Sequence, residues 1–219
     1  MSAAFSTASG TAMAGPDFTS QTGVLTWGAG DFLAKFIDVP IAADSTAEGT
    51  ESFSVALTNA TGGATLGLAS SVANLIDAPF DAWRWEHFGA EANNPDRGAP
   101  LADFDRDGIP NLVEYGLALS PVLSSPAGIS FAAVTSGQPT FTFTRRPTAK
   151  NELTYIVQTS PDLAVWTDGS SYSPAGNIPN TLTTNDITPQ GSPPGFTVVR
   201  DNEFFSSRRR YIRLKISRP

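Results

Sequence analysis

Apolar residues alternate with polar ones along both ends of the chain, and this period of two is typical of half-buried β-strands. Among the first 79 residues the alternation predicts strands at four places, which are 24–27, 37–41, 52–58 and 72–76. Turns that contain glycine, at 28–30 and 61–63, separate some of these runs. This spacing favours an antiparallel β-sandwich.

After residue 121 the same alternation predicts strands at 140–144, 153–157, 196–199 and 211–216. Trp166 follows a turn and is predicted to anchor a core, while residues 168–195 are rich in Gly, Pro and Asn and are expected to form long loops. We therefore expect a second, small antiparallel sandwich here. It is loosely similar to the C-terminal β-modules that follow calcium loops in large secreted bacterial proteins.

The middle of the chain changes character. A short helix is predicted at 80–88, with Asp81 as its N-cap and Gly89 at its end. Pro95 and Pro100 interrupt any helix after that point. A second short helix is expected to begin near Pro110 and to end before Pro121.

Between these helices lies a twelve-residue stretch with the spacing of a calcium loop. Oxygen-bearing side chains stand at loop positions 1, 3, 5, 9 and 12, with Gly108 at position 6. The residue at position 7 offers its backbone carbonyl. The predicted calcium ligands are Asp103, Asp105, Asp107, Ile109, Asn111 (through water) and Glu114. The alternative is an acidic, solvated turn without metal.

This stretch resembles the single EF-hand-like calcium loops of dockerins and of thrombospondin type 3-like repeats. Dockerins carry two such repeats and this chain has one, so cohesin binding is not predicted. Pro100 also prevents a helix from running straight into the loop. We therefore expect a static structural clamp, since a calcium sensor needs two helices hinged at the loop.

The N-terminal segment resembles a Calx-beta domain over about residues 4–78. Four stretches carry the resemblance: GTAMAGPDF (10–18), GVLTW (23–27), IAADSTAEGTESF (41–53) and LID (75–77). It implies a sandwich whose first strands would precede this sequence. We therefore expect a truncated Calx-beta-like sandwich, in a chain that is a fragment or is completed by a neighbouring chain.

The resemblance also implies a second, weaker metal site. Its ligands would be the carboxylates of Asp17, Asp44, Glu48, Glu51 and Asp77. Calcium takes about 6–8 oxygen ligands, so five scattered carboxylates are few. Ala78–Pro79 also replaces the acidic run that the family has after the last strand. The alternative, which this ligand count favours, is that these residues are solvated turn acids.

Three parts are thus predicted in a mostly β chain: a Calx-beta-like sandwich at 1–79, a helical calcium-loop linker at 80–121 and a β-sandwich module at 122–219. Residues 1–120 hold 15 acids against 4 bases, while the remainder holds 6 acids against 10 bases. An acidic first half suits cations and disfavours nucleic acid. Arg208–Arg210 are expected to be outward-facing strand and turn residues.

The sequence gives little support to catalysis. His87 is the only histidine, there is no cysteine, and no nucleophile elbow, phosphate loop or dinucleotide fingerprint occurs. No stretch reaches the length of a membrane span, and the first twenty residues do not predict a signal peptide.

We therefore expect a non-catalytic, calcium-binding structural or adhesive module of a larger extracellular or cell-surface protein. Its protein or glycan partner is not indicated. One alternative is a carbohydrate-binding accessory region of a secreted enzyme, with Trp166 and Tyr172 as a sugar platform. The other is a calcium-dependent, membrane-associated cell-communication module that acts through the Calx-beta acids.

Overall fold

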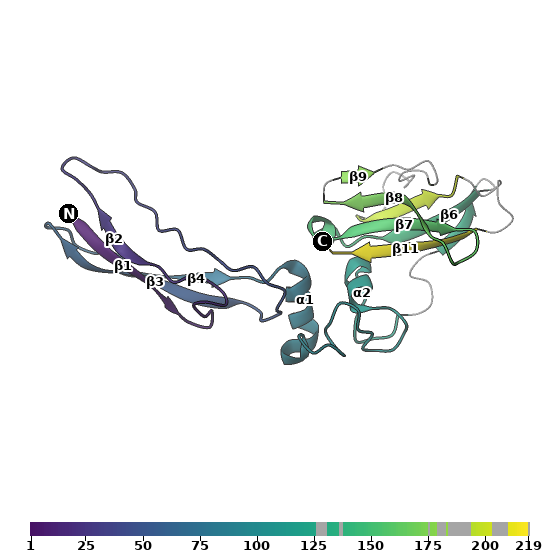
Figure 1. Cartoon of the computed structure of the whole chain (residues 1–219), viewed down its shortest axis with the longest axis horizontal. Coiled ribbons are helices and arrows are strands. Elements are labelled where there is room, and N and C mark those ends of the chain that lie inside the picture. Colours follow the sequence, from purple (N-terminus) through teal and green to yellow (C-terminus); the bar gives the residue numbers. More distant parts are fainter. Residues whose placement is uncertain are drawn as a thin grey trace. The chain divides into compact units, whose positions relative to one another are not determined.

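The computed structural model describes residues 1–125, 131–135, 138–174, 176–178, 183, 194–202 and 210–218. The chain divides into two compact units, Met1–Glu86 and His87–Pro219. The described part is mostly β, with antiparallel sheets and two short α-helices (Figure 1). The predicted fold class is confirmed. Among the described residues, no helix combines the length and the apolar character that a bilayer crossing requires.

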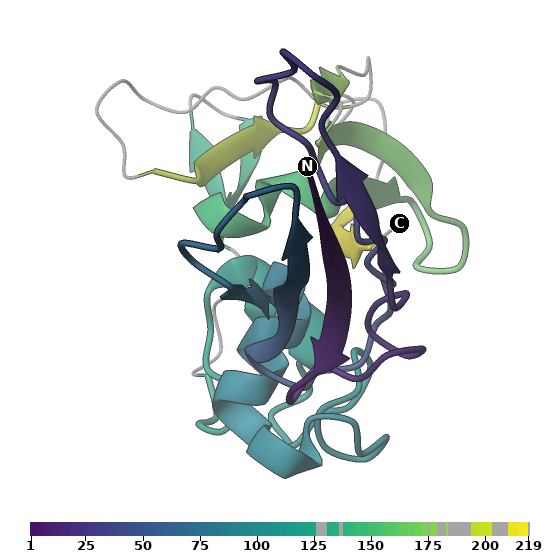
Figure 2. The same ribbon diagram turned by 90° about the vertical axis from the view of Figure 1, so that its left-hand side faces the viewer.

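The first unit is built on one four-stranded antiparallel sheet with the strand order β2-β1-β3-β4 (Figure 2). β1 pairs with β2 on one side and with β3 on the other, and β3 also pairs with β4. The strands are β1 (Ser2–Ser9), β2 (Thr22–Thr26), β3 (Glu51–Thr61) and β4 (Ser70–Leu75). β1 was not predicted from the sequence, because its small Ser, Ala and Thr residues give no clear alternation.

The core of the first unit forms where irregular chain covers the sheet. Phe18 is fully buried, and its ring stacks on that of Phe53 in β3 with ring centroids 4.4 Å apart. Val39 packs against this pair from a segment without regular structure. The predicted strand at 37–41 is therefore wrong. Of the alternating side chains Val39 faces the core whereas Ile41 is exposed, and in this segment only Ile41 forms a bridge, to Phe18.

Helix α1 (Pro79–Phe88) confirms the first predicted helix, and Gly89, with φ +52°, ends it as expected. The prediction that Asp81 is the N-cap is wrong, because the helix begins two residues earlier, at Pro79. Proline suits the first turn because it has no N–H to leave unsatisfied. Asp81 is instead buried in the first turn, and its carboxylate pairs with the Arg84 guanidinium at 2.8 Å. A short 3-10 helix, η1 (Gly89–Glu91), follows.

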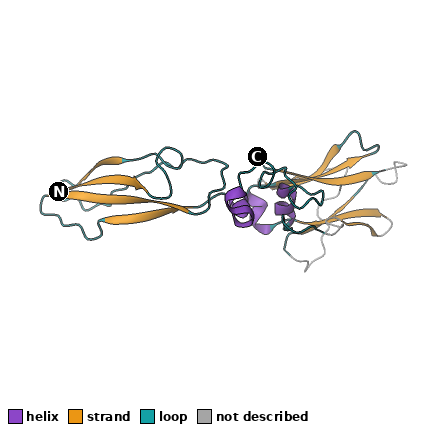
Figure 3. Cartoon of the chain, turned by 90° about the horizontal axis from the view of Figure 1, so that it is seen from below, coloured by secondary structure: helices purple, strands orange, loops and turns teal. Residues whose placement is uncertain are grey.

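The second unit contains two antiparallel sheets, and Figure 3 shows their strands in two layers. Phe143 joins the layers, since its ring lies 6.4 Å from that of Tyr155 and 6.0 Å from that of Tyr172. One sheet has the order β10-β6-β5, from β5 (Phe131–Thr135), β6 (Gln138–Thr144) and β10 (Phe196–Arg200). The other has the order β11-β7-β8-β9, from β7 (Thr154–Ser160), β8 (Thr167–Ser173), β9 (Gly176–Ile178) and β11 (Tyr211–Ser217). A 3-10 helix, η2 (Pro147–Asn151), precedes β7.

Several expectations for the second unit need correction. β8 and β9 lie where long loops were expected, because the Gly and Ser residues of β8 hide its strand character. Trp166 is half-buried at the end of a turn rather than a core anchor. Of the Arg208–Arg210 run, Arg208 and Arg209 lie outside the described residues, as do 179–182 and 184–193. Arg210 is not outward-facing, because it pairs with buried Asp201 at 2.8 Å.

Candidate functional site

Two groups of carboxylates gather in the described chain, one in each unit. In the second unit they occupy the predicted loop, where carboxylate oxygens of Asp103, Asp105 and Asp107 lie within 4.8 Å of one another. Arg106 (φ +63°) and Gly108 (φ +91°) take left-handed backbone conformations that turn the chain sharply at this point.

Backbone N–H groups of the loop hold the first aspartate in place. The Asp103 carboxylate accepts from the N–H of Asp107 at 3.1 Å and from the N–H of Gly108 at 2.9 Å. The Asp107 carboxylate accepts in turn from the N–H groups of Ile109 (2.9 Å) and Ser125 (2.6 Å). The loop therefore holds its conformation through its own hydrogen bonds, and Ser125, which follows helix α2, helps to close it.

Glu114 comes to this loop on helix α2 (Asn111–Leu117), in its first turn, as the sequence predicted. The helix ends at Leu117, before Pro121 as predicted, because Ala118 takes a left-handed conformation (φ +58°). The Glu114 side chain is completely buried, yet neither of its carboxylate oxygens accepts a hydrogen bond from any described residue. The same holds for the buried Oδ2 atom of Asp105.

The electrostatics follow from this packing. Burial raises the pKa of Glu114 to about 8, and the negative charges of Asp105, Asp107 and Asp103 contribute to the shift. Burial also raises the pKa of Asp105, with a further contribution from Asp107 and Asp103. A divalent cation among these oxygens would oppose both effects, because it stabilises the ionised forms.

Asn111 has a role that the sequence did not predict. Its side-chain amide donates to the carbonyl oxygens of Arg97 (2.6 Å) and Ala99 (2.9 Å). It thus fastens the irregular chain that enters the loop, where an EF-hand would have a helix. Its Oδ1 atom is buried and accepts no hydrogen bond from the described residues. Ile109 is half-buried. The predicted roles of Ile109 and Asn111 as ligands remain predictions.

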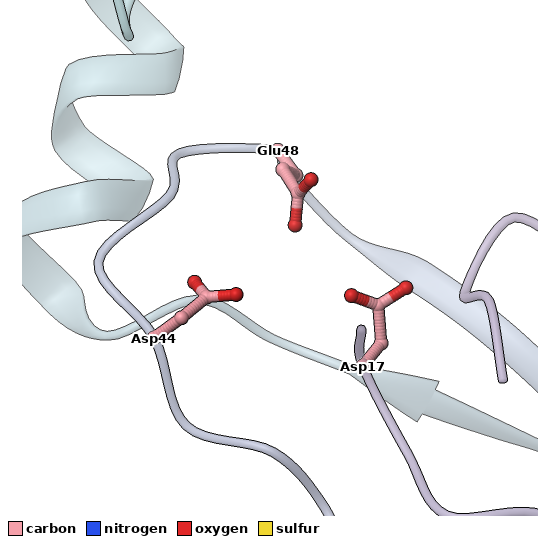
Figure 4. Close-up of side chains that lie close together, drawn as sticks. All are labelled: Asp17, Asp44 and Glu48. Carbon is pink, nitrogen blue, oxygen red and sulfur yellow. The ribbon is translucent and has the colours of Figure 1, made fainter. Parts of the chain in front are cut away.

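In the first unit, all five acids of the implied weaker site line one cavity of about 220 Å³. Figure 4 shows the carboxylates of Asp17, Asp44 and Glu48 directed toward a common space, and their oxygens lie within 4.8 Å of one another. The other acidic residues of the lining are Glu51, Asp77 and Asp81, the last from α1. No pattern in the sequence predicted Asp81 at this cavity, because its position depends on how α1 packs.

The acids of this cavity differ from Glu114 in that several already have donors. Asp17 accepts from the N–H of Met13 at 2.6 Å, and Asp44 accepts from the N–H of Thr46 at 2.8 Å. One oxygen of Asp77 accepts from the N–H groups of Glu48 (3.0 Å) and Gly49 (2.9 Å). These acids therefore depend less on an added cation.

The negative charges in this cavity nevertheless affect the pKa values of two of its acids. Partial burial raises the pKa of Glu48, and the charges of Asp17, Asp44 and Asp77 add to the effect. Partial burial likewise raises the pKa of Glu51, with contributions from Asp17, Glu48 and Asp77. Asp44 and Glu48 are exposed, however, so water screens the repulsion.

The residues predicted for a sugar platform are not available for stacking. Tyr172 is 2% exposed and lies in the core of the second unit. The ring of Trp166 is covered by the Arg213 guanidinium, 3.9 Å from the ring centroid. The carbohydrate-binding alternative therefore loses the two residues on which it depended.

The fold and these clusters define a β-rich protein with carboxylate groups of the kind that bind hard cations. Residues 1–78 match the family model of the Calx-beta domain, which confirms the resemblance predicted for the N-terminal segment. The Calx-beta domain is a non-enzymatic module associated with calcium. The match ends at residue 78, so the resemblances of the loop and of the C-terminal segment remain predictions. No curated protein matches the chain.

Proposed function

We propose that this chain is a non-catalytic, calcium-binding structural module of a larger extracellular or cell-surface protein, and that its main calcium site is the loop from Asp103 to Glu114. The observation that carries the proposal is the buried Glu114 carboxylate, which has no hydrogen-bond donor among the described residues and whose ionisation is opposed by the negative charges of three aspartates.

The physical reason is the cost of burying charge. An ionised carboxylate without a partner is very unfavourable in a protein interior, and a bound cation removes that cost. Calcium takes about 6–8 oxygens. The side chains of Asp103, Asp105 and Asp107, a bidentate Glu114, the Ile109 carbonyl and one water held by Asn111 would meet that number.

The proposed role is architectural or adhesive. The chain enters the loop through turns and leaves it through one seven-residue helix, so the loop has no pair of hinged helices to open. The chain has no cysteine, so calcium replaces disulfides as a source of rigidity. A setting outside the cell is supported by the N-terminal match, since Calx-beta domains occur in extracellular and membrane proteins.

Isothermal titration calorimetry of the metal-free chain with CaCl₂ tests the proposal. We expect Asp103→Ala and Glu114→Ala each to abolish the tighter binding event. Asp96→Asn is the control for the loss of one acidic charge, because Asp96 is an exposed residue of the same unit outside the loop. Absence of binding, or binding that survives both alanine substitutions, would contradict the proposal.

A second candidate function is supported by the acidic cavity of the first unit. We propose that Asp17, Asp44, Glu48, Glu51 and Asp77 form a weaker calcium site, through which the module would take part in calcium-dependent cell communication. The support is their convergence on one cavity in the segment that matches the Calx-beta domain.

This weaker site predicts a second calorimetric event that remains in Asp103→Ala. The event should disappear in the double variant Asp44→Ala/Glu48→Ala. A titration with a single site, lost completely in Asp103→Ala, would argue against it.

A further inference from the structure

We propose that calcium in the loop from Asp103 to Glu114 controls the folding of the C-terminal β-sandwich, with helix α2 as the element that couples them. This inference rests on the proposed function, because it assumes that the loop binds calcium. It goes further in that the metal would stabilise the whole second unit rather than a local linker.

Tyr115 makes the first connection. It directly follows the proposed ligand Glu114 in α2 and is 1% exposed. Its hydroxyl donates to the Glu152 carboxylate, next to the start of β7, and its backbone carbonyl accepts from the Arg146 Nε at 2.7 Å. The Arg146 guanidinium also lies over the Tyr115 ring, 4.8 Å from its centroid. One residue is thus fixed to the sandwich through ring, hydroxyl and backbone.

Gly116 makes the second connection. Its carbonyl accepts from the hydroxyl of Tyr155 in β7 at 2.8 Å and from the N–H of Arg146 at 2.8 Å. A Cβ atom at Gly116 would lie 2.9 Å from the Cδ1 of Ile216 in β11 and 3.2 Å from the Cδ1 of Leu153. Helix α2 therefore packs its backbone directly on the sheet that contains β7 and β11.

Because α2 is short, its helical conformation depends in turn on these contacts with the sandwich. An isolated helix of seven residues is unstable in water, because nucleation is costly and few hydrogen bonds repay it. The helical conformation that places Glu114 in the loop thus depends on the contacts of Tyr115 and Gly116. If the sandwich unfolds, α2 loses these contacts and Glu114 is no longer held near the aspartates.

A ligand that binds only the folded form stabilises every part that must fold with its site. Helix α2 belongs to both the loop and the sandwich. Calcium should therefore lower the equilibrium constant for the unfolding of β7 and β11 by the same factor as the equilibrium constant for the unfolding of the loop. A loop that folded independently would protect only its own residues.

Hydrogen exchange of the full chain, read by NMR or by mass spectrometry of peptides, distinguishes these two cases. Calorimetry on the same sample supplies the Kd. At free calcium about 100-fold above Kd, the slowest amides of β7 and β11 should exchange about 100-fold more slowly than without calcium. Glu114→Gln should fold, because glutamine matches the size of the neutral acid, and it should abolish this slowing. Asp96→Asn should keep it.

The outcomes separate the two proposals. Slower exchange in β7 and β11 that depends on Glu114 supports the coupling. Calcium binding in the calorimeter with slower exchange confined to residues 103–117 overturns the coupling and leaves the loop site intact. Absence of calcium binding overturns the proposed loop site, and the coupling with it.

Discussion

The two carboxylate clusters differ in how they are built and in what they lack. The loop of the second unit takes its acids from twelve consecutive residues, and its key member, Glu114, is buried without a hydrogen-bond donor among the described residues. The cavity of the first unit collects its acids from distant parts of the sequence, and backbone N–H groups already serve Asp17, Asp44 and Asp77. Closeness of acids is therefore a weaker indication of a metal site than burial with unmet hydrogen-bonding capacity.

Removal of calcium should produce the largest difference between the two units, as a loss of stability in the second. At free calcium 100-fold above Kd, the ligand adds about 2.7 kcal/mol to the free energy of unfolding. For a unit of this size, chelation should lower the melting temperature by about 5–10 °C. Differential scanning calorimetry with CaCl₂ and with EDTA measures this. The shift should appear in the transition of the second unit, and an equal shift in Glu114→Gln would contradict the assignment.

Acidification should weaken calcium binding by the next largest factor. Burial raises the pKa of Glu114 to about 8, so below that pH a proton competes with the metal. Between pH 8 and pH 6, we expect the calcium affinity to fall by on the order of 10- to 100-fold. Titrations at both pH values measure the change, and heats in buffers of different ionisation enthalpy reveal proton release. A pH-independent affinity would show that Glu114 is already ionised in the metal-free protein.

The metal-free protein should show the opposite pH dependence in its stability. Between about 4.5, the ordinary pKa of a glutamate, and about 8, folded Glu114 holds a proton that the unfolded chain releases. The folded state therefore binds more protons, and the contribution of Glu114 to stability is lost as pH rises through this range. Thermal unfolding in EDTA at pH 5 and pH 8 should show this decline, and Glu114→Gln should reduce it.

Asn111→Ala should have an intermediate effect. It removes both hydrogen bonds to the carbonyls of Arg97 and Ala99, and leaves these acceptors without the donor that now serves them. We expect a loss of about 1–3 kcal/mol in the free energy of unfolding, with a weaker calcium affinity. Chemical denaturation and calorimetry measure the two quantities. Val113→Ala, a half-buried position on the same helix, is the control for a general loss of packing.

Substitutions in the acidic cavity of the first unit should have the smallest effect on stability and on calcium binding. Glu48→Gln removes one negative charge from an exposed side chain whose pKa is raised by partial burial and by its acidic neighbours. We expect a slight rise in the melting temperature of the metal-free first unit and no change in the tighter calcium event. A large loss of that tighter event would reverse our ranking of the two clusters.

Some elements could be predicted from the sequence, and others could not. β3, β6 and β11 follow from clear alternation, and α1 was predicted with Gly89 at its end, although Asp81 was wrongly taken as its N-cap. β1 and β8 were missed because they consist largely of small polar residues, and their partner strands make them strands. The segment 37–41 alternates like a strand, but its backbone finds no neighbouring strand.

The sequence by itself determined the cluster of Asp103, Asp105 and Asp107, because these acids are closely spaced along the chain and Gly108 permits the turn that brings them together. It also determined the Calx-beta character of the first 78 residues. Only the tertiary structure decided that Glu114 is buried without a donor among the described residues, and that Tyr115 and Gly116 attach its helix to the sandwich. The physical reason is that burial depends on residues far apart in the sequence, whereas loop geometry depends on neighbours.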